Sequence, residues 1–156
     1  MGRAVGTEGA EVAVASQTRL STLSYLLDTD ICSHLIKVGT AAAMKKLEQV
    51  ADTEVRMSIV TWAELLFGCA LRPEATAFNA RVQAFAQLVE PLAVGVEVAA
   101  HYADIRCALQ RKGTPIGSND LWIAAHARSA GMTLVSHNTR EFKRVPDLKL
   151  EDWMAP

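Results

Sequence analysis

Three acidic residues lie within apolar segments of this chain and constrain what it can fold into. Asp28 follows the apolar run 25–27, Glu64 interrupts the run 62–67, and Asp120 precedes the run 121–125. An ionised carboxylate that is removed from water is costly unless a cation or strong hydrogen-bond donors compensate it. The fold must therefore gather these acids at a common polar place, where a hard divalent metal is their simplest partner.

The composition indicates one globular domain and excludes several classes of protein. The chain has 156 residues, half of them apolar, which is enough for a single core. No apolar run approaches the roughly 20 residues that span a bilayer, and Glu8 and Glu11 interrupt any signal-peptide core. We therefore expect a cytoplasmic protein with no membrane partner. Because the net charge is −1, nucleic acid would have to be bound through local contacts or a metal.

From residue 25 onward, short apolar runs alternate with segments of helical period. This alternation predicts a three-layer α/β/α fold around a central, mainly parallel sheet. Thr61 is the expected cap of one helix, Ser118 or Asn119 the expected cap of another, and Pro91 places its strand at a sheet edge. The predicted strands are 25–28, 55–60, 89–94, 133–136 and 148–150, and the predicted helices are 29–37, 41–51, 61–71, 74–88, 97–112, 120–130 and 139–144.

Residues 1–24 differ from the rest of the chain. They are dominated by Gly, Ala, Ser and Thr, contain no aromatic residue and show no sustained period. We interpret them as a disordered or mis-started N-terminal extension, followed by one domain over residues 25–154.

The predicted sheet brings the acids to one edge, because ligands bind beyond the carboxyl ends of parallel strands. Asp28 ends the first strand, Asn138 follows the strand 133–136, and Glu64 and Asp120 lie near the starts of helices. Carboxylates around Mg²⁺ or Mn²⁺ form a site for phosphodiester hydrolysis, since the metal lowers the pKa of a water and neutralises the leaving oxygen. We predict Asp28, Glu64 and Asp120 as catalytic metal ligands, with Asn138 and Glu141 as further metal ligands.

Each candidate also has a purely structural explanation. Asp28 can cap the helix that follows it, and Asp120 is favourable near a helix N-terminus without any metal. Asn138 can be an ordinary turn residue, and Glu141 a capping or surface acid. Asp30 is interpreted mainly as a cap and only secondarily as a ligand. The histidines are interpreted as packed or surface residues, and Thr61 and Ser136 either as caps or as donors to the carboxylates.

Four segments in order resemble one family. The segments 26–31 (LLDTDI), 61–68 (TWAELLFG), 116–127 (IGSNDLWIAAHA) and 138–142 (NTREF) are similar to the PIN-domain ribonuclease toxins of VapBC toxin–antitoxin modules. The resemblance runs from about Tyr25 to Trp153. It matches Asp28, Glu64 and Asp120 to the first three family acids, and the region of the fourth acid to Asn138 and Glu141.

The resemblance implies a PIN-like fold and an endoribonuclease that depends on Mg²⁺, for which Mn²⁺ can substitute. It also implies an RNA substrate such as tRNA or another structured RNA, a homodimer, and a cognate VapB-type antitoxin whose tail covers the site. Asn138 departs from the commonest pattern, which has Asp there, and so puts a second metal in doubt. Asp30 also differs, because Asn is more usual at its position.

Two other classes of protein share part of this pattern. Asp28-Thr29-Asp30 after an apolar strand is also typical of haloacid-dehalogenase phosphatases, but the segment 138–141 does not fit their later motif and Glu64 has no role there. A receiver-like phosphoacceptor domain fails in a similar way. The non-enzymatic alternative is a PIN-like or flavodoxin-like interaction module that uses metal only structurally, or not at all.

Overall fold

The computed structural model describes residues 24–50 and 54–156. Its centre is a sheet of five strands: β1 (Tyr25–Leu27), β2 (Val55–Ser58), β3 (Pro91–Leu92), β4 (Thr133–Val135) and β5 (Leu150–Glu151). All pairs are parallel, and the spatial order is β3-β2-β1-β4-β5. The chain therefore places β2 and β3 on one side of β1 and later places β4 and β5 on its other side. Such a reversal of strand order opens a crevice at the carboxyl ends of the two neighbouring strands, here β1 and β4.

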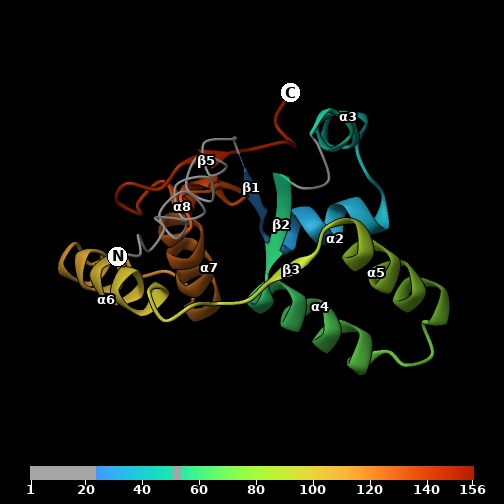
Figure 1. The fold of residues 1–156 in the computed structure, drawn as a ribbon, viewed down its shortest axis with the longest axis horizontal. Helices are drawn as coiled ribbons and strands as arrows, with labels where there is room; N and C mark the ends of the chain where they lie inside the picture. The colour runs from blue at the N-terminus through green and yellow to red at the C-terminus, as the bar shows by residue number, and fades with distance from the viewer. Residues whose placement is uncertain (1–23, 51–53) are drawn as a thin grey trace, which may run out of the picture.

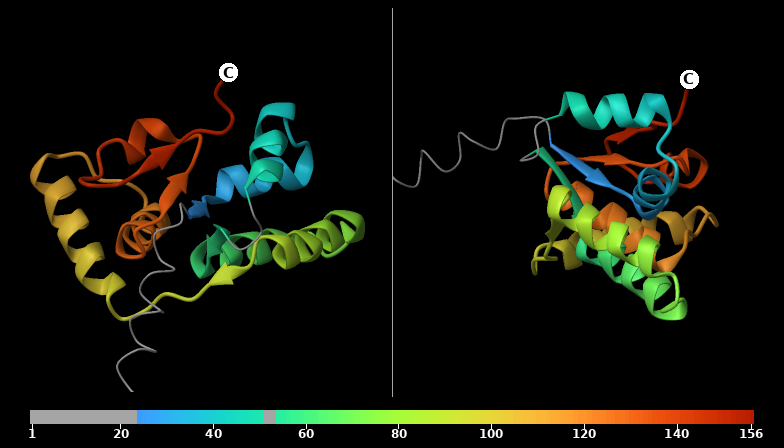
Figure 2. Two further views of the ribbon diagram at one scale, coloured as in Figure 1. Left: turned by 45° about the horizontal axis from the view of Figure 1, so that its top comes forward. Right: turned by 90° about the vertical axis from the view of Figure 1, so that its right-hand side faces the viewer.

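Helices cover both faces of this sheet (Figure 1). They are α2 (Thr29–Lys37), α3 (Ala41–Gln49), α4 (Ile59–Leu71), α5 (Thr76–Leu88), α6 (Val98–Arg111), α7 (Ser118–Ser129) and α8 (Thr139–Phe142). Figure 2 shows the two helical layers from further directions, with α6 and α7 on the side opposite α2 and α5. The predicted three-layer α/β/α architecture is confirmed.

Alternation along the strands divides the core into two parts. Leu27 and Met57 pack with α2, α4 and α5, whereas Leu26 and Leu134 pack with α6 and α7. Successive strand residues point to opposite faces, and both faces are covered, so the strands are apolar throughout. This explains why short uninterrupted apolar runs marked the strands in the sequence.

The boundary between β2 and α4 lies two residues earlier than predicted. Helix α4 begins at Ile59, and Ser58 is its cap, with its Oγ accepting the Val60 N–H at 3.2 Å. The expected cap, Thr61, is instead a buried residue inside the helix. Ile59 and Val60 are β-branched and suggested a longer strand, but the Ser58 cap ends it.

The predicted caps of α7 are also wrong. The helix begins at Ser118, and Gly117 occupies the N-cap position without any side-chain cap hydrogen bond. Asp120 consequently lies in the first turn, where the helix dipole favours a negative charge. The strand expected at 89–94 is reduced to Pro91–Leu92, and it does lie at the sheet edge as its proline indicated.

The prediction for residues 1–24 falls outside the described residues, apart from residue 24 itself. None of the helices in the described ranges has the length and apolar character needed to cross a membrane.

Candidate active site

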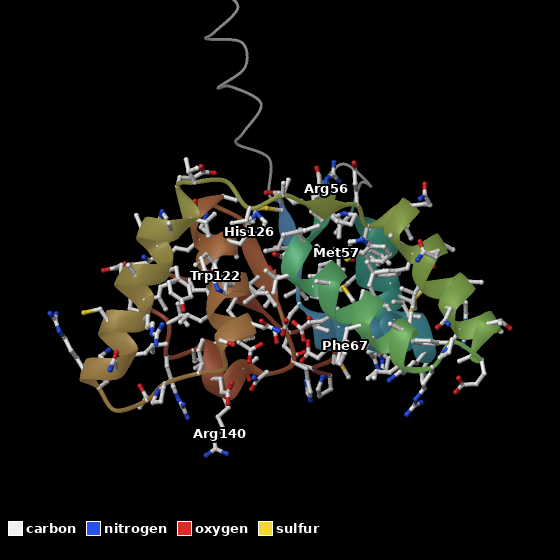
Figure 3. All side chains as sticks on the ribbon, turned by 90° about the horizontal axis from the view of Figure 1, so that it is seen from below. Arg56, Met57, Phe67, Trp122, His126 and Arg140 are labelled. Atoms are coloured by element: carbon white, nitrogen blue, oxygen red, sulfur yellow. The ribbon has the colours of Figure 1, made fainter. Side chains whose placement is uncertain are left out.

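The predicted acids meet at the carboxyl ends of β1 and β4. Charge repulsion from Asp120 acts on Asp28, and repulsion from Glu64 and Glu141 acts on Asp120. Seen from below, oxygen-bearing side chains gather between the α7 and α4 sides of the molecule (Figure 3). Residues from four distant segments thus form one acidic cluster, which we define as Asp28, Asp30, Glu64, Asp120 and Glu141.

Asp28 is the most buried member of the acidic cluster. The residue is only 4% exposed, and it follows β1 directly as the N-cap of α2. One carboxylate oxygen accepts the Thr29 N–H at 2.7 Å, and the other accepts the Ser136 hydroxyl at 2.8 Å. Asp28 is therefore both a helix cap and a member of the acidic cluster. Ser136, whose role the sequence left open, is a donor that holds this carboxylate.

Asp30 belongs to the acidic cluster, although the sequence pattern favoured a capping role for it. Its Oδ1 accepts the Ile31 N–H at 2.7 Å, which is a local contact. Its Oδ2, however, accepts the His137 N–H at 3.1 Å, beyond the end of β4, and its charge acts on both Asp28 and Asp120. The sequence signal that could have placed Asp30 in the acidic cluster is its spacing from Asp28. The two acids flank Thr29, the first residue of a helix that starts at the sheet edge.

Glu64 reaches the acidic cluster from the second turn of α4. Its Oε1 accepts a hydrogen bond from the Thr29 hydroxyl at 3.1 Å, and that hydroxyl also lies 3.3 Å from the hydroxyl of Thr61. Thr29 thus joins the start of α2 to α4. The early start of α4 at Ile59 is what places Glu64 further along the helix than the sequence suggested.

Asp120 and Glu141 occupy the other side of the acidic cluster. The Asn138 side-chain amide donates to Glu141 Oε2 at 3.1 Å, and a side-chain hydrogen bond links the Asp120 and Glu141 carboxyl groups. Asn138 is the N-cap residue of α8 but forms no side-chain cap hydrogen bond. Its amide is therefore directed to the acid beside it, and the segment 138–141 supports the site as a unit.

Crowding of these acids disfavours their ionised forms. Burial, followed by repulsion from Asp30, raises the pKa of Asp28 to about 7, despite the hydrogen bonds from Ser136 and Thr29 that oppose this effect. Burial, followed by repulsion from Glu141 and Glu64, raises the pKa of Asp120 to about 6. Near neutral pH the cluster thus carries negative charge that the surrounding donors only partly compensate.

The chemistry of the donor set suits a hard divalent cation, because the cluster offers carboxylate oxygens whose mutual repulsion a cation would relieve. As the side chains lie, no three His, Cys, Asp or Glu residues in the described ranges converge closely enough to hold a metal ion. Metal binding would therefore require the carboxylates of Asp28, Glu64 and Asp120, which come from three separate elements, to move closer together.

The histidines behave as packed or surface residues, as predicted. His126 is buried, and its Nδ1 lies 2.9 Å from the Ser58 hydroxyl that caps α4. Burial lowers the pKa of His126, so this contact between α7 and α4 is made by a neutral ring. His137 is exposed and pairs with Asp152 at 2.9 Å.

Comparison with known proteins agrees with this geometry. The family model for the PIN domain matches residues 25–148. The chain is 36% identical over 131 residues to the tRNA(fMet)-specific endonuclease VapC of Shigella flexneri, covering 84% of this chain and 98% of that protein. It is 33% identical over 130 residues to ribonuclease VapC1 of Haemophilus influenzae strain R2866, covering 83% of this chain and 97% of that protein.

A solved structure extends this similarity to three dimensions. VapBC2 from Rickettsia felis, bound to a DNA fragment from its promoter, contains a chain that superposes with a TM-score of 0.79 at 32% identity. The superposition covers 84% of this chain and 99% of that chain. The family match spans most of the sequence, and the solved relative shares the fold. The chain therefore belongs to the PIN-domain family, in its VapC branch.

Proposed function

We propose that this protein is the endoribonuclease toxin of a type II toxin–antitoxin module and that it hydrolyses RNA phosphodiesters with Mg²⁺ or Mn²⁺. The observation that carries this proposal is the convergence of Asp28, Glu64 and Asp120 at one sheet edge, with raised pKa values for Asp28 and Asp120. VapC relatives named as ribonucleases support the reaction class, and the Shigella flexneri relative supports tRNA as a substrate class. We further propose that the protein acts in the cytoplasm, where such RNA is found.

In this proposal Asp28, Glu64 and Asp120 hold the metal, and Asp30, Asn138 and Glu141 complete its surroundings. A bound divalent cation supplies an activated water and neutralises charge on the leaving oxygen. The protein's own contribution is positional. Ser136 and the Thr29 N–H fix the Asp28 carboxylate, the Thr29 hydroxyl fixes Glu64, and the Asn138 amide fixes Glu141. Such supporting hydrogen bonds orient metal-binding side chains and tune their basicity.

Exposed cations beside the acidic cluster can receive the RNA backbone. Arg140 lies on α8, next to Glu141, and its side chain extends away from the body of the molecule (Figure 3). Lys143 follows it and is also exposed. Because the net charge of the chain is −1, phosphate binding must depend on such local groups. They would guide the strand to the acids, which alone would repel it.

We expect RNA cleavage by the purified chain to require a divalent metal. With tRNA as substrate, Mg²⁺ or Mn²⁺ should support cleavage, and excess EDTA should reduce the rate by at least about 100-fold, because carboxylates without a cation repel the scissile phosphate. The measurement is gel analysis of 5′-labelled RNA. Readdition of metal beyond the chelator should restore the rate.

Two outcomes would count against this function. Cleavage that persists unchanged in EDTA would show that the reaction does not need a metal. Release of phosphate from p-nitrophenyl phosphate, without any RNA cleavage, would indicate a phosphatase instead. A binding module would show neither activity.

We also propose a cognate VapB-type antitoxin as the partner of this chain, supported by the VapBC complex from Rickettsia felis. Among the described residues, neither Asp28 nor Asp120 forms an ion pair with a basic side chain of this chain. An inhibitory segment with a basic side chain would therefore be complementary to the acidic cluster. The antitoxin would thereby occupy the position of the metal or the RNA.

The chain is further proposed to form a homodimer through the exposed apolar face of α4. Phe67 and Leu71 are 64% and 65% exposed, and Ile59 and Leu66 are also open to solvent. Large exposed apolar patches of this kind mark interaction sites. We expect the chain without antitoxin to be a dimer by multi-angle light scattering. Phe67→Ser should give a monomer, whereas Val38→Ser, which changes a residue that is 78% exposed at the end of α2, should leave the dimer intact. A monomeric wild type would refute this arrangement.

A further inference from the structure

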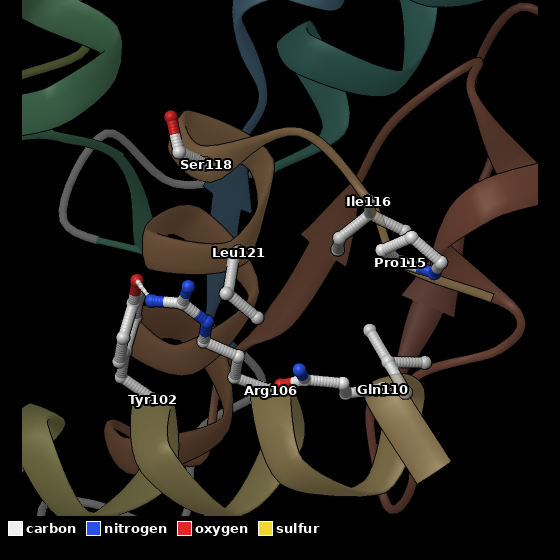
Figure 4. Close-up of a pocket in the computed structure, with 8 residues that line it drawn as sticks. Tyr102, Arg106, Gln110, Pro115, Ile116, Ser118 and Leu121 are labelled. Atoms are coloured by element: carbon white, nitrogen blue, oxygen red, sulfur yellow. Dashed lines mark hydrogen bonds between the residues drawn. The ribbon is translucent and has the colours of Figure 1, made fainter. Parts of the chain in front are cut away.

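A cavity lies beside the acidic cluster, between α6 and the loop that leads into α7 (Figure 4). Its volume is about 320 Å³, and it is lined by Tyr102, Arg106, Leu109, Gln110, Pro115, Ile116, Ser118 and Leu121. This is near the lower end of the size range of ligand pockets. The cavity has room for one planar ring system rather than for a folded segment of another protein.

The walls of the cavity combine apolar surfaces with a few polar groups. Leu109, Ile116 and Leu121 provide apolar lining, and Gln110 and Ser118 add polar side chains. In Figure 4 the Gln110 amide lies near Arg106, whereas the Ser118 hydroxyl points away from it. An amide group such as that of Gln110 can hydrogen-bond the edge of a base, and apolar walls can contact its faces. This composition suits a nucleobase better than a purely apolar ligand.

An aromatic stack contacts a cation at the cavity. Tyr102 stacks on Trp122 with ring centroids 4.1 Å apart. Arg106 donates to the Tyr102 hydroxyl at 3.0 Å, and its guanidinium carbon lies 5.9 Å from the centre of the Tyr102 ring. The nearest acid on the same helix, Asp104, is already paired with Arg128 at 2.6 Å. Within the described residues Arg106 forms no ion pair. Its guanidinium group can therefore pair with a phosphate or stack on a base.

The cavity and the acidic cluster share a wall. Ile116 and Ser118 line the cavity, and Gly117 lies between them. A Cβ added at Gly117 would meet Asp120 Oδ2 at 3.5 Å, so the Asp120 carboxylate lies beside this segment. A nucleotide bound in the cavity would therefore be adjacent to a phosphate placed at the acids.

We infer that this cavity binds one unpaired base of the RNA, next to the phosphodiester that is cleaved. The inference rests on the proposed ribonuclease function and adds a determinant of where the RNA is cut. Single-stranded bases are commonly recognised by stacking on aromatic or arginine planes, together with hydrogen bonds to their edges. Tyr102 acts as a positioning residue here, because it holds the guanidinium of Arg106.

The test compares two arginine variants on α6. Arg106→Gln removes the charge at the cavity, whereas Arg111→Gln removes an equal charge near the end of the same helix, outside the lining. A short RNA that contains the mapped cleavage site is used with Mg²⁺ or Mn²⁺. We expect Arg106→Gln to raise KM about tenfold with kcat within about twofold, and Arg111→Gln to change either value by less than about twofold. Tyr102→Phe, which keeps the stack on Trp122, should raise KM by a smaller factor.

The same RNA carrying one abasic nucleotide identifies the base that binds. At one position beside the cleavage site, loss of the base should raise KM about tenfold for the wild type but less than about twofold for Arg106→Gln. The inference would be overturned if the two arginine variants had equal KM values. It would also be overturned if wild type and Arg106→Gln responded equally to every abasic position. Either result would point to a protein ligand instead. If the wild type cleaves no RNA at all, the proposed function fails, and this inference fails with it.

Discussion

Asp120→Asn is expected to reduce RNA cleavage by about three orders of magnitude while the fold is retained. The substitution keeps the size of the side chain and its place in the first turn of α7, but it removes the charge. A metal at such a site contributes several kcal/mol to the transition state, and roughly 1.4 kcal/mol corresponds to a factor of ten in rate. Single-turnover cleavage of tRNA at saturating Mg²⁺ measures the effect. Asp28→Asn and Glu64→Gln should cause losses of similar size.

Glu48→Gln provides the matched control, because Glu48 is an exposed acid on α3 and lies outside the acidic cluster. It should leave the rate within about twofold of the wild type. Circular dichroism should give the same spectrum for all variants. If any one of the three cluster variants retained the wild-type rate, that residue would have no role in holding the metal.

Asp30→Asn is expected to have an intermediate effect, a loss of about 10-fold to 100-fold that is typical of groups beside a metal-binding shell. The asparagine oxygen can still accept one backbone N–H, from Ile31 or from His137, but the negative charge is lost. A loss equal to that of Asp120→Asn would place Asp30 among the direct ligands. If Asp30→Asn kept the wild-type activity, Asp30 would serve only as a local cap.

The metal-free protein should be less stable at pH 8 than at pH 5, which reverses the usual behaviour of a paired carboxylate. The pKa of Asp28 rises from 3.8 to about 7 in the folded state, through burial first and repulsion from Asp30 second. Between these values the unfolded chain binds fewer protons than the folded chain, so the free energy of unfolding falls as pH rises. A tenfold change in a proton-binding constant corresponds to about 1.4 kcal/mol, which gives a loss on the order of 2–4 kcal/mol for this buried group.

Urea unfolding in EDTA measures this effect. Asp28→Asn should remove most of the pH dependence and be more stable than the wild type at pH 8, because a neutral side chain can still accept the Thr29 N–H without being repelled by Asp30. Adding Mg²⁺ at pH 8 should stabilise the wild type more than the variant, since the metal binds only the folded state. A wild type that gains stability between pH 5 and pH 8 without metal would contradict the raised pKa.

Much of the site was predictable because parallel strands present their carboxyl ends at one edge. The acids at 28, 64 and 120 were recognisable because each lies in an apolar segment, where an ionised group needs a partner. Strand–helix alternation then placed them on the same side of the sheet. The four ordered segments added the family, which neither spacing nor composition alone could supply.

What the sequence did not predict depended on contacts between distant segments. Asp30 has a local cap partner in Ile31, and only its contacts with the Ser136 hydroxyl and the His137 N–H, 106 and 107 residues away, place it in the acidic cluster. The boundary at Ser58 was missed because Ile59 and Val60 have strand propensity, and the cap hydrogen bond outweighs it. The cavity beside α6 could not be predicted either, since its lining joins a helix face to a loop whose path the sequence leaves open.

The hydrogen bond from the Ser136 hydroxyl to Asp28 spans 108 positions of the chain and has a consequence for synthesis. The first acid is translated early, but β4, which precedes its donor directly, is among the last elements to leave the ribosome. A growing chain therefore cannot complete the acidic cluster until β4, Ser136 and the segment that carries Glu141 have been synthesised.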